Sequence, residues 1–154
     1  MPCMFYPHPD DKNKTQRLLA HAAVLGCPPY PIAFEFQKLS YETWQGFANE
    51  SVGILSTLTR HAAYKWEEYH FYSVFTGIAE PQNKNLLAAV YLGNGKGVLV
   101  IANQTSRNIK SGEITVHIRN SCFKGKDIIV NVPELKAFEW KFIEFKYQQE
   151  EKYQ

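Results

Sequence analysis

The sequence predicts an α+β chain in which two βα units precede an antiparallel β-sandwich. Two stretches before residue 63 have apolar residues at helical spacing, and a short apolar run precedes each of them. From about Tyr64 onward, β-branched and aromatic residues dominate and turn signals recur at short spacing. Strands that alternate with helices indicate a parallel sheet, whereas closely spaced strands indicate an antiparallel one. We therefore divide the chain into residues 1–63 and residues 64–154.

The first βα unit begins with the apolar run Pro2–Tyr6, which predicts a strand. The proline-rich sequence PHPDD after it favours a loop and prevents a helix from starting there. Gly26 is placed to end the next helix at its C′ position, and Pro28-Pro29 prevent its continuation. The apolar residues of this helix are Leu18, Leu19, Ala22, Ala23 and Leu25.

The second βα unit contains the strand Ile32–Phe36 and a helix that Ser40 can cap. The broad apolar stripe of this helix comprises Trp44, Phe47, Ala48, Ile54, Leu55, Leu58 and Ala62. Parallel strands need cover on both faces, and two strands alone do not make a stable sheet of that kind. We therefore expect that residues 1–63 are the final βα units of a larger parallel sheet, whose missing strands lie upstream.

The second part of the chain predicts about six strands. Leu86–Leu92 and Val98–Ala102 flank Asn94-Gly95, a strong hairpin signal. The other predicted strands are Tyr69–Ile78, Ile114–Ile118, Asp127–Val132 and Phe138–Tyr147. In the last strand the apolar positions change parity between Phe142 and Ile143, which indicates a bulge or burial on both faces. Strands with this spacing predict a β-sandwich or an open antiparallel sheet.

Composition argues against several functional classes. The net charge of +2 and the lack of any Lys/Arg cluster argue against a nucleic-acid partner. No apolar run is long enough to span a membrane, and residues 1–10 do not resemble a signal peptide, which leaves the localisation open. The three cysteines and the histidines show no metal-site spacing, so we expect neither a metal nor a cofactor.

The order of these elements resembles a known enzyme family. RLLAHAAVLGCPPYPIAFEF is similar to the penultimate helix and final strand of a (β/α)8-barrel glycoside hydrolase. NLLAAVYLGNGKGVLVIANQTSRNIKSGEITVHI resembles the C-terminal β-sandwich that follows such barrels, in which a strand ends in Asn as GVLVIAN does here. AFEWKFIEF resembles the usual last strand, so the likeness extends from about Phe5 to Tyr147. The resemblance implies that residues 1–63 are the final βα units of a truncated (β/α)8 barrel and that residues 64–154 are an accessory antiparallel β-sandwich. The chain would then be the C-terminal part of a glycoside hydrolase-like, carbohydrate-active protein.

The same resemblance suggests where a substrate would lie. Active sites of such barrels are built at the C-terminal ends of the strands. These positions are His8, Asp10 and Asp11 after the first strand, and Glu35 and Gln37 at the end of the second. For Asp10 or Asp11 the alternative role, that of a helix cap, is favoured. Glu35 is the stronger candidate, because an unpaired carboxylate buried in an apolar strand is costly. In the substrate site, these residues are expected to bind the sugar rather than to form the catalytic pair of carboxylates. The catalytic residues are not assigned, and the chain alone is expected to be inactive.

Two other functions fit the same pattern: a non-catalytic carbohydrate-binding or adhesion β-module, and an independent α+β domain of unknown role. Carbohydrate is the expected partner of the glycoside hydrolase-like parent protein and of the carbohydrate-binding module. Unpaired parallel strands and an exposed apolar stripe recruit further chains, so the N-terminal half is expected to self-associate. Asn49-Glu-Ser and Asn103-Gln-Thr match the glycosylation acceptor pattern. Trp140 lies at the centre of a predicted strand, so we expect it in the core rather than on a sugar-binding surface.

Overall fold

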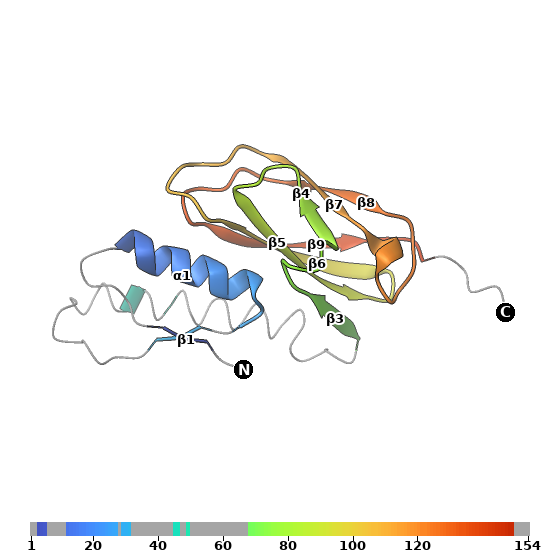
Figure 1. Cartoon of the computed structure of the whole chain (residues 1–154), viewed down its shortest axis with the longest axis horizontal. Helices are drawn as coiled ribbons and strands as arrows, with labels where there is room; N and C mark the ends of the chain where they lie inside the picture. The colour runs from blue at the N-terminus through green and yellow to red at the C-terminus, as the bar shows by residue number, and fades with distance from the viewer. Residues whose placement is uncertain are drawn as a thin grey trace.

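The computed structural model describes residues 3–5, 12–27, 29–31, 45–46, 49 and 68–149. Over these ranges the chain is α+β, with a helix lying beside a sandwich of two antiparallel sheets (Figure 1). This confirms the predicted α+β content and the antiparallel character of the second part. Of the predicted helix that follows residue 40, the structure describes only Gln45, Gly46 and Asn49, which are helical.

The described N-terminal part is a parallel βα unit. Strands β1 (Cys3–Phe5) and β2 (Pro29–Pro31) pair in parallel, and α1 (Lys12–Val24) lies between them in the sequence. The parallel pairing confirms the prediction, but the second strand pairs earlier than expected, and residues 32–36 lie outside the described residues. Proline lacks a backbone N–H, but its fixed φ is compatible with extended backbone. Strand β2 is therefore a short strand whose only backbone donor is the N–H of Tyr30.

Helix α1 ends as predicted at Gly26, which has φ +66°. The N–H of Cys27 donates to the carbonyl of Ala22 at 3.1 Å, and the N–H of Gly26 donates to that of Ala23 at 3.3 Å. This pair of bonds is the Schellman motif, and it satisfies carbonyls that the end of the helix would otherwise leave unpaired.

The larger sheet has the strand order β3-β5-β6-β9. Its strands are β3 (Tyr69–Tyr72), β5 (Leu86–Gly93), β6 (Lys96–Asn103) and β9 (Trp140–Lys146). The β5–β6 hairpin turns at Asn94-Gly95 as predicted, although only Gly95 has a positive φ. The turn is therefore not the mirror-image form that requires a positive φ at both central residues.

The smaller sheet has the order β4-β7-β8. Its strands are β4 (Ala79–Pro81), β7 (Gly112–Val116) and β8 (Ile128–Val132). A single strand over Tyr69–Ile78 was the wrong expectation, because β3 ends at Tyr72 and the chain then crosses by a loop to β4 in the other sheet. Ile118 is buried as expected, but it begins a short 3₁₀ helix, η3 (Ile118–Asn120).

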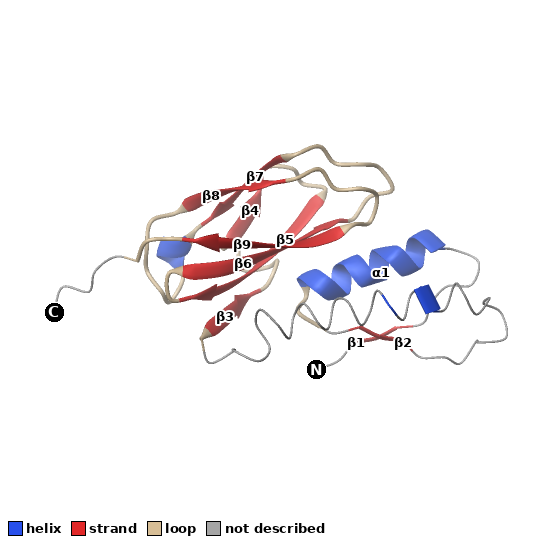
Figure 2. Ribbon diagram, turned by 180° about the vertical axis from the view of Figure 1, so that it is seen from behind, coloured by secondary structure: helices blue, strands red, loops and turns tan. Residues whose placement is uncertain are grey.

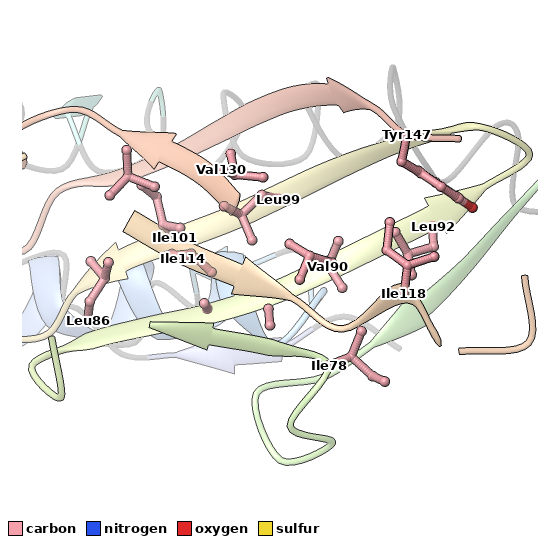
Figure 3. Close-up of a cluster of buried hydrophobic side chains, with 14 of the residues drawn as sticks. Ile78, Leu86, Val90, Leu92, Leu99, Ile101, Ile114, Ile118, Val130 and Tyr147 are labelled. Atoms are coloured by element: carbon pink, nitrogen blue, oxygen red, sulfur yellow. The ribbon is translucent and has the colours of Figure 1, made fainter. Parts of the chain in front are cut away.

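The two sheets share the main core. Its side chains come from β4 to β8, from Ile78 just before β4, and from the segments that follow β6, β7, β8 and β9 (Figure 3). The fully buried members include Val90, Leu92, Leu99, Ile101, Ile114, Val116, Ile118 and Leu135. Side chains from both sheets meet in this layer, so the second part of the chain is a β-sandwich.

Strand β9 contacts two cores. Trp140 and Phe142 pack towards α1, whereas Ile143 and Phe145 pack towards the core between the sheets. The register with β6 is continuous from Ala102↔Trp140 to Lys96↔Lys146, so the parity change reflects burial on both faces and not a bulge. Phe138 does not belong to this strand, because its φ of +56° is in the left-handed region.

Candidate functional site

The residues predicted to bind substrate, His8, Asp10, Asp11, Glu35 and Gln37, all lie outside the described residues. In the described part of the chain, side chains with functional potential gather in other places. These places include the junction between α1 and the larger sheet, and a charged cluster on the smaller sheet.

At the junction, α1 buries one face against β5, β6 and β9. Leu19, Ala20, Ala23 and Val24 of α1 meet Ala89, Val100 and Ala102 of the sheet, and each is at most 1% exposed. Four of these seven residues are alanine, and their short side chains let the helix backbone approach the sheet closely. Figures 1 and 2 both show α1 between the sandwich and the β1–β2 pair.

Aromatic rings close the edges of the junction. Phe71 and Tyr91 pack with ring centroids 4.7 Å apart, and Trp140 meets Phe142 edge to face at 5.5 Å. A Cβ at Gly26 would lie 2.7 Å from the Tyr91 hydroxyl oxygen, so the end of α1 fits against this ring only as glycine. Burial, with a smaller contribution from Cys27, raises the pKa of Tyr91 to about 12. Trp140 is half-buried and packs against the α1 core, as expected.

Asn103, the residue that ends the GVLVIAN strand, is fully buried and makes four side-chain hydrogen bonds. Its Nδ2 donates to the carbonyls of Arg107 at 2.6 Å and Lys136 at 2.8 Å. Its Oδ1 accepts from the N–H and the hydroxyl of Thr105 at 2.9 and 2.8 Å. The side chain therefore joins two loops, which leaves this glycosylation acceptor inaccessible in the folded chain, whereas Asn49 is exposed.

The charged cluster is centred on His117, whose two ring nitrogens face two carboxylates. Nδ1 lies 2.9 Å from Asp127 Oδ2, and Nε2 lies 2.9 Å from Glu80 Oε2. Arg119 Nε also donates to Asp127 Oδ2, at 2.7 Å. A neutral imidazole can donate from only one nitrogen, so only the imidazolium form satisfies both carboxylates.

The pKa values of the cluster follow from this geometry. The hydrogen bond to Asp127, followed by that to Glu80, raises the pKa of His117 above its usual value. For Asp127, burial acts to raise the pKa, but the hydrogen bonds from Arg119 and His117 outweigh it and leave the pKa below its usual value. The described residues contain no group of three or more His, Cys, Asp or Glu that could hold a metal ion. The cluster is therefore best described as an ion-pair network that connects β4 to the ends of β7 and β8.

Sequence reasoning missed this cluster because its members are far apart in the chain. Glu80 precedes His117 by 37 residues, and Asp127 follows it by 10. The available signal was the alternation of polar Thr115, His117 and Arg119 with buried Ile114, Val116 and Ile118. That pattern places the histidine on the outer face without indicating its partners.

Comparisons with known proteins identify no relative: no family model matches the chain, and no curated protein or solved structure is significantly similar to it. Among the described residues, no helix is long and apolar enough to cross a membrane.

Proposed function

We propose that this chain is the C-terminal part of a glycoside hydrolase-like, carbohydrate-active protein. In this proposal residues 64–154 are an accessory β-sandwich whose role is structural. The observation that carries it is the position of α1, whose apolar face is covered by the larger sheet. The sandwich therefore contributes the packing surface for the helix of a βα unit.

The packing of α1 favours this role over that of a separate binding module. A helix that connects two parallel strands buries its inner side against those strands, and its outer side is normally left to solvent. Here the residues that meet the sandwich are fully buried and lie on both turns of the C-terminal half of α1. A binding module tethered by a linker would not need a shared core of this kind.

The proposal includes the absence of catalysis by this chain alone. Residues 1–63 supply at most two of the eight βα loops from which barrel active sites are built. A catalytic pair of carboxylates normally draws on different strands. The substrate-binding role of His8, Asp10, Asp11, Glu35 and Gln37 therefore belongs to the parent protein.

Hydrogen exchange on a matched pair of variants tests the structural role. Val90 and Val100 are both fully buried strand valines, but Val90 faces the core between the sheets and Val100 faces α1. Truncation of either to alanine removes the same two methyl groups, at a cost of about 2 kcal/mol. Val100→Ala should accelerate amide exchange in α1 by roughly thirtyfold while leaving β7 and β8 protected.

Val90→Ala is the control, and it should instead accelerate exchange in β7 and β8 of the opposite sheet. If the exchange of α1 is the same in wild type and Val100→Ala, the sheet does not stabilise the helix. The accessory role would then be wrong.

A further inference from the structure

A cleft of about 560 Å³ opens at the end of the sandwich where β4 ends and β7 begins. Its floor is apolar and consists of Leu86, Ile109 and Val132, which are all buried. These side chains come from both sheets and from the loop between β6 and β7, so the cleft lies where the main core reaches the surface. Small-molecule sites commonly combine this size with an apolar floor and a few polar groups.

The rim of the cleft is polar and consists of two loops. The β4–β5 loop contributes Asn83 and Lys84, and the β6–β7 loop contributes Lys110 and Ser111. The rim carboxylate, that of Glu113, already accepts a hydrogen bond from Gln82 Nε2 at 3.2 Å.

The groups left without an intramolecular partner are mainly donors. Within the described part of the chain, the ammonium groups of Lys84 and Lys110 make no hydrogen bond or ion pair, and neither does the Ser111 hydroxyl. The side-chain oxygen of Asn83 accepts from the N–H of Asn85 at 2.9 Å, which leaves its NH₂ group for a ligand. An apolar floor under a rim of cationic and neutral donors favours an oxygen-rich anion that also has an apolar face.

We propose that this cleft binds an acidic saccharide unit. The C–H face of the sugar ring would cover Leu86, Ile109 and Val132, and its carboxylate would lie between Lys84 and Lys110. The hydroxyl groups would accept from Asn83 and Ser111. The negative charge of the proposed ligand follows from the donors that line the cleft, whereas the choice of a saccharide rests on the proposed carbohydrate-active parent.

Titration of the ¹⁵N-labelled full chain, followed by amide chemical shifts, tests this inference with three probes. Glucuronate should produce saturable shifts at Lys84, Lys110 and Ser111. Glucose lacks the charge and isobutyrate lacks the ring, so each should bind at least about tenfold more weakly. An increase in salt from low to physiological concentration should weaken glucuronate binding, because the ion pairs are exposed.

Variants of the rim lysines test whether glucuronate binds at this cleft. The double variant Lys84→Gln/Lys110→Gln should weaken glucuronate binding by about tenfold. Lys126→Gln is the matched control: this exposed lysine precedes β8, at the opposite end of β7 and β8 from the cleft, and its loss should have no effect.

Three results would overturn the inference: no saturable shift with glucuronate, equal binding of glucose or isobutyrate, or equal weakening by the control variant. The exchange of α1 in Val100→Ala does not depend on this cleft. Failure of the saccharide site and failure of the proposed function are therefore distinguishable.

Discussion

The Nδ1 atom of His117 lies 2.9 Å from Oδ2 of Asp127, and this pair joins the end of β7 to the start of β8. Because Glu80 faces the other ring nitrogen, the charged form of the histidine connects all three strands of the smaller sheet. The stability of the sandwich should therefore depend on pH in a defined direction.

We predict that the charge-dependent contribution of His117 to the stability of the fold is lost as pH rises. Its folded pKa is raised, so its contribution is complete below the unfolded value of 6.5 and is lost as pH rises through the folded pKa. The pKa of Asp127 is lowered, so its contribution is present above 3.8 and is lost as pH falls through its folded pKa. Urea unfolding should show His117→Gln to be less stable than wild type by about 1 kcal/mol at pH 5.5.

At pH 8.5, where the wild-type imidazole is increasingly neutral, the difference between the two proteins should shrink. A difference of the same size at pH 5.5 and pH 8.5 would show that the contribution of His117 is packing and not charge.

Loss of the Asn103 side chain should destabilise the chain more than the loss of any exposed asparagine. Asn103→Ala removes one of the two donors to each of the carbonyls of Arg107 and Lys136, and it removes the side-chain acceptor of the Thr105 N–H. We expect a cost of about 3 kcal/mol in the free energy of unfolding, because part of this network is buried. Thermal or urea unfolding measures it directly.

Asn108→Ala provides the control, since Asn108 is exposed and its Nδ2 donates to Glu134 at 3.2 Å on the surface. Its effect should stay within about 0.5 kcal/mol. Similar costs for the two variants would mean that Asn103 does not fix the loops.

Local signals in the sequence predicted several elements correctly. Asn94-Gly95 identified the β5–β6 hairpin, and Gly26 identified the end of α1. A tight turn and a helix end each depend on the conformation of one or two residues, so local sequence is enough to predict them. The parity change at Phe142 and Ile143 was also visible, but only tertiary packing decides between a bulge and burial on both faces.

Features that depend on contacts between distant residues could not be predicted. The sequence around Tyr72 and Ala79 favours extended backbone throughout, and only the pairing partners place these residues in different sheets. The cluster around His117 and the cleft beside Leu86 depend in the same way on segments that folding brings together. The predicted substrate-binding residues lie outside the described residues and remain predictions.

Self-association through the N-terminal half is expected of the isolated chain. In the described part, β1 and β2 form a sheet of only two parallel strands, which lack the neighbours that such strands normally have. Sedimentation velocity should show concentration-dependent association. Phe34→Lys should reduce it, because Phe34 belongs to the predicted strand Ile32–Phe36, whose edge is expected to be unpaired.

Phe75→Lys is the control for this variant, because Phe75 is 85% exposed in the loop that follows β3 and lies outside residues 1–63. This change should leave association unaltered. A chain that stays monomeric at high concentration, or that dissociates equally with both variants, would contradict the expectation.

If the proposed function is correct, the purified chain should not hydrolyse glycosides, because residues 1–63 would supply at most two of the eight loops of a barrel active site. A panel of aryl glycosides, monitored by release of the chromophore, measures this. Turnover that Glu35→Gln abolishes would show that the chain contains a complete catalytic site.

The size of the native polypeptide tests the central claim most directly. An antibody raised against residues 68–149 should detect the protein on a denaturing gel of the cells that produce it. If the chain is the last part of a barrel enzyme, the band should lie near or above about 40 kDa, the mass of a whole barrel with its sandwich. A single band at 17.7 kDa, the mass of the 154 residues alone, would contradict the account.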